Sequence, residues 1–553
     1  MALPDHCDIL VVGGGNAGFC AAIAAAEALS ISQSQSQPSS TTPNNNNNNN
    51  DKKNTRVLLI DKCPASWAGG NTYFTAGAFR TVHGGLADLL PLVNNVDDDQ
   101  ISKIDMDPYT AADFLHDLRR VTGGRCDPAL SRALVHDSNE TVKWLARHGV
   151  RFQLAFNRQA YEVDGRVKFW GGMALQTEDG GKGLIEDHRA AADRLGVVVS
   201  FSTAARRLVT DPKTGGVTSV IVVHDGQEKE IPTKAVILAA GGFEANPRLR
   251  AQYLGPDWDV AMVRGTPYNT GDVLETALRD CGALPAGHWS GCHAVAWDAH
   301  APPHAGDRER TNELTKSGYP LGIMVNRDGE RFVDEGMDLR NYTYAMFGRA
   351  ILQQPGHVAF QVWDSRTAPW LRQEEYREEV VPQRITASSI AELAEKCARH
   401  GLRDKHSFLR TIEEYNRAVY RHRREHPHAR WNPAGKDGLS TQSSTQRLRI
   451  PKSNWALPLD APPFLAVKVG CGITFTFGGL AVDPDTAAVL RSAGGAIPGL
   501  YCAGEMLGGL FYDNYPGGSG LMAGAVFGRR AGRAAAAAVM ASSPAPARGE
   551  ARL

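Results

Sequence analysis

Residues 7–18 read Cys7-Asp8-Ile9-Leu10-Val11-Val12-Gly13-Gly14-Gly15-Asn16-Ala17-Gly18, an apolar run that passes directly into a cluster of glycines. The apolar run predicts a buried strand, and the alanine-rich residues 17–29 that follow predict a helix. Between a strand and a helix, the pattern G-x-G-x-x-G is typical of a dinucleotide site. The sequence therefore predicts a Rossmann-like α/β domain.

Each residue of this turn has a physical reason to be there. Gly13 permits the tight turn, Gly15 lets the backbone approach a pyrophosphate, and Gly18 lets the helix pack closely on the strand. Asn16 and Ala17 open the helix, where free N–H groups and the positive end of the helix dipole attract phosphate. These five residues are predicted cofactor contacts.

An acidic residue at the end of the second strand normally binds the ribose in this fold. Asp61 ends the strand-like residues 57–60 and fits that role, with Lys62 beside it. Asp61 lies 43 residues beyond Gly18, whereas about 20 is usual. Residues 30–54 form a polar tract with seven consecutive asparagines, and without its 25 residues the spacing is 18. Such a tract has nothing to bury, so it is predicted to be a disordered insertion.

Further glycine-containing segments indicate that the dinucleotide is FAD rather than NAD. An NAD site is completed within the first half of its fold, whereas a flavin that extends across the molecule also needs contacts from the C-terminal part. The predicted contacts are Gly69, Gly70, Asn71 and Thr72 after the second strand, Ala240 and Gly241 after a later strand, Gly504 and Glu505 near the C-terminus, and Ser519 and Leu521 at the start of the last helix.

The composition argues against several classes of binding partner and site. Lysine plus arginine and aspartate plus glutamate both total 60, and this balance argues against a nucleic-acid partner. Nine cysteines without a C-x-x-C pair argue against a disulfide framework, a metal site and an iron–sulfur centre. No apolar run reaches the length of a transmembrane segment. The strand begins at residue 7 and leaves no room for a signal peptide, so we expect a cytoplasmic protein.

The last three residues indicate a second cellular location as an alternative to the cytoplasm. Ala551-Arg552-Leu553 resembles the small–basic–leucine tripeptide that directs proteins to peroxisomes. A chance ending is the alternative interpretation.

A length of 553 residues predicts two or three domains. Residues 281–462 contain more aromatic and charged side chains and fewer glycine-rich turns than their flanks. We therefore expect an FAD-binding domain formed by residues 1–280 and 463–540, interrupted by an α+β domain at 281–462 and followed by a disordered tail at 541–553.

The chain resembles the FAD-dependent flavoprotein subunits of fumarate reductase and succinate dehydrogenase and their soluble relatives. The resemblance covers nearly the whole length and is carried by residues 12–18, 69–77, 329–335, 340–344 and 472–479 and by Asn514-Tyr515-Pro516-Gly517-Gly518-Ser519-Gly520-Leu521. It implies that residues 281–462 form a capping domain over the flavin and substrate. Residues 69–77 lack the histidine to which respiratory members attach FAD, which implies non-covalent binding.

The resemblance also implies a catalytic set. Arg340 occupies the family's proton-transfer position, although a guanidinium hardly ever deprotonates and is better suited to clamp a carboxylate or relay a proton. A surface arginine paired with Asp338 or Glu335 is the alternative. His293 resembles the histidine at the substrate carboxylate, and a satisfied core histidine is the alternative there.

Two departures from the family bear on the substrate. Fumarate reductases carry a histidine where this chain has Thr474, and a second carboxylate-binding arginine where it has Tyr515. The string around Tyr515 also resembles flavin-dependent ketosteroid dehydrogenases, in which this tyrosine polarises a carbonyl or assists proton removal. Tyr342 and Tyr344 are lesser candidates for the same hydrogen bonds.

The leading hypothesis is an oxidoreductase that dehydrogenates or reduces a carbon–carbon bond beside a carboxylate by hydride transfer to flavin N5, with a polycarboxylate such as tricarballylate as substrate. An enoyl-type or steroid-like ketone substrate is the first alternative, and a flavin-binding protein without turnover is the second. Electrons would pass to an external acceptor, which could be a protein, a quinone or oxygen.

Overall fold

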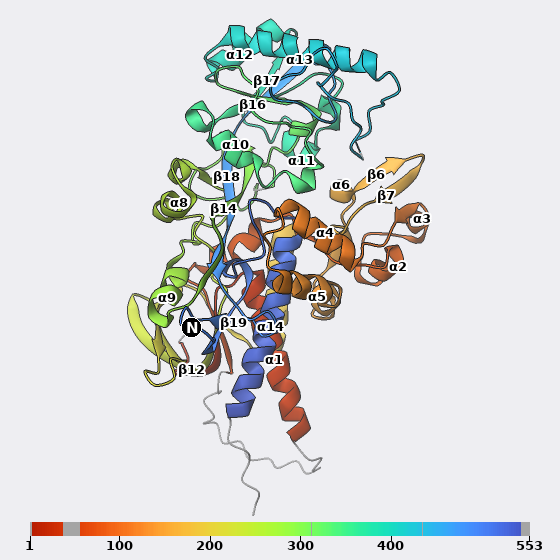
Figure 1. Ribbon diagram of the computed structural model, residues 1–553. Helices are drawn as coiled ribbons and strands as arrows, with labels where there is room; N and C mark the ends of the chain where they lie inside the picture. The colour runs from red at the N-terminus through yellow and green to blue at the C-terminus, as the bar shows by residue number, and fades with distance from the viewer. Residues whose placement is uncertain (1–2, 37–55, 311, 434, 543–553) are drawn as a thin grey trace, which may run out of the picture.

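The computed structural model describes residues 3–36, 56–310, 312–433 and 435–542, and it has two parts. In Figure 1 the larger part lies below, and the smaller part above it carries α12 (Ile390–Arg399) and α13 (Lys405–Glu425). The bulk of the predicted insertion (37–54) and of the predicted tail (543–553), with the tripeptide Ala551-Arg552-Leu553, falls outside the described residues.

The larger part is built around a sheet whose central strands are parallel. β1 (Cys7–Val12) pairs with β2 (Val57–Ile60) on one side and with β12 (Gln227–Leu238) on the other, and β12 pairs with β20 (Ala496–Cys502). β2 is buried along its whole length, which explains its continuous apolar sequence. The sheet also contains β9 (Val198–Ser200), β10 (Thr203–Thr210), β11 (Val217–His224) and β19 (Ala488–Leu490).

The order of these strands explains why distant glycine segments meet. The carboxyl ends of parallel strands lie at one edge of a sheet, which is where ligands bind in such folds. β1, β2, β12 and β20 therefore deliver the segments that begin at Gly13, Asp61, Ala239 and Ala503 to the same place. The predicted α/β architecture is confirmed.

Two long helices lie side by side under this sheet, α1 (Asn16–Ser36) and α14 (Ser519–Ser542), as Figure 1 shows. Glycines let them touch, because a Cβ at Gly528 would lie 2.5 Å from the Ala17 carbonyl oxygen. The prediction of disorder from residue 30 was wrong for residues 30–36, which continue α1 because neither glycine nor proline interrupts the chain before Pro38. Residues 541 and 542, predicted as tail, likewise belong to α14.

The smaller part contains a second sheet that is mostly antiparallel. Its strands are β13 (Met262–Val263), β14 (Pro285–Asp298), β15 (Ile323–Asn326), β16 (Ala359–Trp363), β17 (Arg384–Ala387) and β18 (Phe464–Leu480). Successive side chains of β15 face opposite sides, as strand geometry requires. Ile323 and Val325 join the core that contains Leu393 of α12, whereas Met324 joins a core that contains Trp363.

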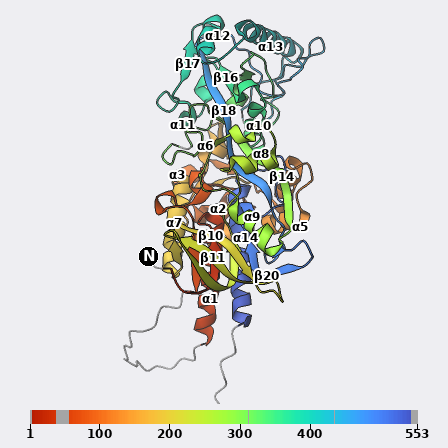
Figure 2. The ribbon, with the colours of Figure 1, turned by 90° about the vertical axis from the view of Figure 1, so that its left-hand side faces the viewer.

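β18 connects the two parts, as Figure 2 shows. Its first residues pair with β16 and β17, and its last residues pair with β14 and accept a hydrogen bond at the Leu480 carbonyl from the Gly508 N–H at 3.0 Å. The second sheet thus includes strands on both sides of the boundaries predicted at 281 and 463. The division into domains at those residues stays a prediction.

A third group of elements lies beside the larger part and includes α4 (Ala111–Val121), α5 (Pro128–Arg147) and α7 (Gly180–Arg194). Two small three-stranded sheets belong to the same region. One is antiparallel and consists of β3 (Ala78–Phe79), β5 (Phe152–Leu154) and β8 (Leu175–Thr177). The other consists of β4 (Ile104–Met106), β6 (Ala160–Val163) and β7 (Arg166–Phe169), in which β7 pairs parallel with β4 and antiparallel with β6.

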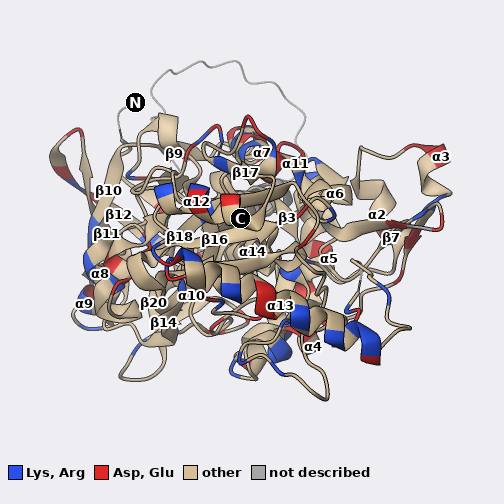
Figure 3. Cartoon of the chain, turned by 90° about the horizontal axis from the view of Figure 1, so that it is seen from above, with Lys and Arg blue, Asp and Glu red and all other residues tan. Residues whose placement is uncertain are grey.

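Basic and acidic segments alternate over the surface, for example along α13 in Figure 3. None of the helices in the described ranges combines the length and apolarity needed to cross a membrane.

Candidate active site

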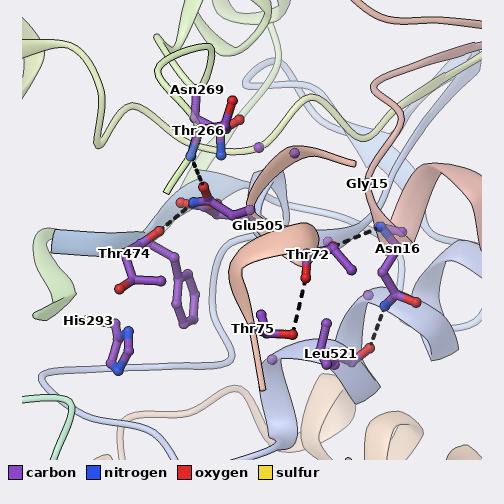
Figure 4. Close-up of a pocket in the computed structure, with 18 of the residues that line it drawn as sticks. Gly15, Asn16, Thr72, Thr75, Thr266, Asn269, His293, Thr474, Glu505 and Leu521 are labelled. Carbon is purple, nitrogen blue, oxygen red and sulfur yellow. Dashed lines mark hydrogen bonds between the residues drawn. The ribbon is translucent and has the colours of Figure 1, made fainter. Parts of the chain in front are cut away.

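A large cavity begins at the carboxyl edge of the first sheet and continues to residues of the second sheet. Figure 4 shows Gly15, Asn16 and Leu521 on one side of it and His293 and Thr474 on the other, with Thr72 and Glu505 between them. Most of the predicted cofactor contacts line it: Gly13, Gly15, Asn16, Ala17, Asp61, Lys62, Gly70, Asn71, Thr72, Ala240, Gly241, Gly504, Glu505 and Leu521.

Three predicted contacts lie behind the cavity wall instead. Gly18 packs against the glycine turn, because a Cβ at this position would lie 1.8 Å from the Gly13 carbonyl oxygen. Gly69 has a φ of 109° and makes the turn before Gly70. Ser519 is buried and donates its hydroxyl hydrogen bond to the Pro516 carbonyl. These residues shape the cavity without lining it.

Hydrogen bonds hold the glycine turn in place. The Asn16 N–H donates to Thr72 Oγ1 at 2.9 Å, and the Asn16 side chain donates to the Leu521 carbonyl at 2.8 Å. Asp61 accepts from the Gly14 N–H at 2.8 Å, so its carboxylate lies beside the turn, and its contact with a ribose stays a prediction. Lys62 lines the cavity but pairs with Asp272 at 2.7 Å, so its charge is already balanced by protein.

Glu505 is half-buried and belongs to a pair of carboxyl groups that sequence analysis did not identify as a pair. Its carboxylate accepts from the Thr476 N–H at 2.6 Å and from the Thr476 hydroxyl at 3.0 Å, and it hydrogen-bonds the carboxyl group of Glu244. Glu244 is fully buried and accepts from the side chains of Asn71 and Asn269. Burial and the charge of Glu505 raise the pKa of Glu244 well above its ordinary value, and burial raises the pKa of Glu505 to about 7.

The raised pKa of Glu505 predicts a specific pH dependence of stability. Between about pH 4.5 and pH 7 the folded state holds a proton that the unfolded state releases, so this contribution is complete below pH 4.5 and is lost as the pH rises towards 7. In Glu505→Gln we expect the free energy of unfolding to fall less steeply over this interval, by up to about 1.4 kcal/mol per pH unit. Denaturant unfolding at several pH values measures this slope, and the exposed Glu309→Gln is the control. Equal slopes in all three proteins would contradict the assignment.

Arg340 lies on a short turn, η6 (Arg340–Tyr342), and lines the cavity. The alternative that it is a surface ion pair is wrong, because Asp338 pairs with Arg120 and Lys436, and Glu335 pairs with Arg331. Among the described residues, the hydrogen bond found for its guanidinium goes to the Ser317 hydroxyl at 3.4 Å. Ser317 also donates to Glu375, whose carboxylate pairs with Arg372 at 3.3 Å. Within the described part of the chain, the positive charge of Arg340 therefore lines the cavity without a paired carboxylate.

His293 lies in an aromatic wall of the same cavity. Its ring centroid is 5.0 Å from that of Tyr344, 5.2 Å from that of Tyr515 and 6.0 Å from that of Phe475. It is buried, yet neither ring nitrogen has a hydrogen-bond partner within the described residues. The alternative of a satisfied core histidine is therefore not supported. Burial, aided by the nearby charge of Arg264, lowers the pKa of His293 well below its ordinary value, so the ring is neutral.

Tyr515 and Tyr344 hydrogen-bond each other through their hydroxyl groups. Burial, followed by the effect of Tyr344, raises the pKa of Tyr515 well above its ordinary value, so Tyr515 stays protonated and can donate a hydrogen bond. Tyr342, the other candidate, points away to Asp117, to which its hydroxyl donates at 2.8 Å. Sequence spacing could not distinguish Tyr342 from Tyr344.

A buried network fixes the two segments that carry these tyrosines. Arg80 donates to the Gly517 carbonyl at 2.8 Å and pairs with Asp117 at 3.1 Å, and Asp117 also accepts from Tyr342. Asn514 completes the connection by donating to the Tyr342 carbonyl at 2.5 Å. Residues 340–344 and 514–518 are thus held together across the cavity.

The cavity suits an extended dinucleotide. A Cβ at Gly15 would meet no protein atom closer than 3.5 Å, so the space above the turn is open to a ligand. The N-terminus of α1 lies at this end of the cavity, and such helix ends favour phosphate. The cavity continues from there past Glu505 to the aromatic wall, so a long ligand can lie along it.

Comparison with known proteins agrees with this geometry. A family model described as an FAD binding domain matches residues 102–521, about three quarters of the chain. The NADH:fumarate oxidoreductase of Klebsiella pneumoniae is 25% identical over 97% of this chain and 48% of its own length. The chain thus spans about half the length of that relative.

A second relative has a different substrate. The 3-oxosteroid 1-dehydrogenase of Mycobacterium tuberculosis is 28% identical over 62% of this chain and 60% of its own length. Among solved structures, the open conformation of a flavocytochrome c3 fumarate reductase aligns with a TM-score of 0.67 and 24% identity, covering 97% of this chain and 79% of that one. This likeness confirms the predicted fold, a Rossmann-like FAD domain with a capping domain.

Proposed function

The chain belongs to the family of proteins with this FAD binding domain, and from that premise we propose that it is an oxidoreductase acting on a carbon–carbon bond beside a carboxylate. FAD is its cofactor. The proposal of a carboxylate substrate rests on Arg340, a cation on the cavity wall without a paired carboxylate among the described residues. A planar guanidinium is well suited to hold a carboxylate in two hydrogen bonds.

The reaction requires three contributions near the substrate. Bound FAD would supply the hydride acceptor at N5 when the substrate is oxidised. The carboxylate beside the reacting carbon must be held and its developing enolate-like charge stabilised, and Arg340 does this. A proton must also leave the neighbouring carbon, and Arg340 is positioned to pass it on through the Ser317 hydroxyl and Glu375.

His293 and Tyr515 complete the proposed catalytic set. A neutral imidazole donates one hydrogen bond and accepts another, so His293 can orient a carboxylate oxygen without adding charge. Tyr515 can donate to the same carboxylate or to a carbonyl oxygen. The finer proposal for the substrate is a polycarboxylate such as tricarballylate, with an external protein, quinone or oxygen as electron acceptor.

Product analysis with a dye as electron acceptor tests this proposal. We expect turnover with tricarballylate, and nuclear magnetic resonance spectra that show a new double bond beside a carboxylate. Succinate tests a shorter acid, and a 3-oxosteroid tests the alternative. Turnover of the 3-oxosteroid together with no turnover of tricarballylate or succinate would contradict the proposal.

That alternative has an observation in its favour. The ring of Tyr515, whose hydroxyl pairs with that of Tyr344, packs against the rings of Phe475, Phe477 and Phe511, a setting suited to an apolar ketone. The steroid dehydrogenase relative is consistent with it. The unpaired arginine favours the acid, because a neutral ketone leaves a cation without a partner.

We propose further that FAD is bound without a covalent link, since residues 69–77 contain no histidine. Acid precipitation of the yellow protein should therefore release all of the flavin into the supernatant. A yellow pellet would contradict this expectation.

A further inference from the structure

Arg264 is a further cation that lines the cavity, and sequence analysis did not predict it as a site residue. It directly follows β13, and its N–H donates to the Ile473 carbonyl of β18 at 2.8 Å. Its guanidinium donates to the Thr474 hydroxyl at 3.1 Å and lies 5.3 Å from the Trp297 ring centroid. The residue lines the same cavity as Arg340 and His293.

The surroundings of Arg264 leave its charge without a protein partner. No ion pair to it is found within the described residues, and its Nε is buried without an acceptor. Glu375, whose negative charge acts on Arg264, pairs with Arg372 and accepts from Ser317. His293 is neutral, and Tyr515 is protonated and carries no charge. Desolvation lowers the pKa of Arg264 below its ordinary value.

Arg264 is half-buried, and a charge that is partly removed from water is costly unless something compensates it. Among the described residues no carboxylate forms an ion pair with Arg264, and the cavity is open to a ligand. We propose that Arg264 forms a second carboxylate-binding site, so that the substrate carries at least two carboxylates, one held by Arg340 and the other by Arg264. This inference rests on the proposed function and adds to it the residue that holds the second carboxylate of a polycarboxylate substrate.

The position of Arg264 adds an independent reason. Its neighbours are tied to the cofactor end of the cavity, because the Thr266 N–H donates to Asn71 at 2.8 Å and Asn71 donates to the Thr474 carbonyl at 2.5 Å. The guanidinium is therefore held by Thr474 in the part of the cavity that His293, Arg340 and the aromatic wall also line. Thr474 itself is too short and uncharged to hold an anion alone.

Equilibrium binding to the oxidised holoenzyme separates this site from the reaction. Aconitate has three carboxylates and crotonate has one, and both already contain the double bond, so neither can reduce oxidised flavin. In Arg264→Met we expect the Kd of aconitate, followed by the change in flavin absorption or by calorimetry, to rise about 10- to 100-fold, the loss typical of a hydrogen bond to a charged group. The Kd of crotonate should change less than about threefold.

Two further variants serve as controls for this binding experiment. Arg264→Gln removes the charge with a smaller change of shape, and it should lose the same affinity while keeping its flavin. Arg349→Met is the matched control, because Arg349 also lies over a tryptophan, Trp258, but does not line the cavity. Arg349→Met should bind aconitate as the wild type does.

The outcomes distinguish the two proposals. Aconitate binding that is unchanged in both Arg264 variants would overturn the second carboxylate site, even if acids are oxidised. Weakened aconitate binding without oxidation of any acid would support the site and overturn the proposed reaction.

Discussion

Arg340→Ala is expected to lower kcat/KM for the acid substrate by about 10²- to 10⁴-fold, the range typical of a lost proton-transfer or charge-stabilising group. The side chain lines the cavity, pairs with no carboxylate among the described residues and reaches Ser317 at 3.4 Å. The flavin should stay bound, because none of the cofactor contacts that we predict depends on Arg340. Steady-state kinetics together with the absorption spectrum of the variant measure both properties.

Arg340→Lys separates charge from geometry. A lysine keeps the positive charge but cannot form two parallel hydrogen bonds, so we expect most of the loss to remain. Arg310→Ala is the control, since Arg310 lies on the same capping part and pairs with Glu313 at 3.0 Å. Activity of Arg340→Ala within threefold of the wild type would refute its catalytic role.

Gly18→Ala is expected to cost the protein its flavin and much of its stability. The added Cβ would lie 1.8 Å from the Gly13 carbonyl oxygen and 3.0 Å from the Gly13 carbonyl carbon. These are backbone atoms of the cofactor turn, so they cannot rotate away, and α1 must shift from β1. Overpacking of this kind usually costs about 1–3 kcal/mol and sometimes more. Flavin content after purification and the midpoint of denaturant unfolding measure the two effects.

Gly84→Ala is the matched control for this change. A Cβ at Gly84 would meet Asp88 at an ordinary distance of 3.8 Å. That variant should therefore retain its flavin and its stability. A fully yellow Gly18→Ala protein with wild-type unfolding would mean that the packing of α1 on the glycine turn does not matter for the cofactor.

Local patterns were sufficient for the cofactor half of the fold. The apolar run that ends before Gly13 predicted β1, and the alanine-rich residues after the turn predicted α1. Asp61 was identified after the tract at 30–54 had been left out of the spacing, and its carboxylate accepts a hydrogen bond from the turn. The end of α1 was missed because Ser and Gln are acceptable in helices, so composition alone could not show where the helix stops. β18 was also beyond local patterns, because its seventeen residues serve two sheet regions at once.

The residues that sequence analysis missed are those whose importance arises from distant partners. Glu244 lies two residues after a pair of glycines, and no feature of the local sequence marks it as important. Its importance comes from Glu505, 261 residues later, whose carboxyl group forms a hydrogen bond with it. Arg264 stands out only because no carboxylate of the described residues pairs with it, and the lack of a partner in space cannot be recognised from a sequence. Arg340, His293 and Tyr515, by contrast, were predicted through the family resemblance, and the structure brings all three to one cavity.

The most direct test of the proposed function is an anaerobic titration of the oxidised holoenzyme with tricarballylate, followed by absorption in the visible range. The account predicts that the oxidised flavin band bleaches in the wild type and persists in Arg340→Ala. A wild-type spectrum that does not respond to tricarballylate, succinate or related acids, and that is bleached by a ketosteroid, would contradict it.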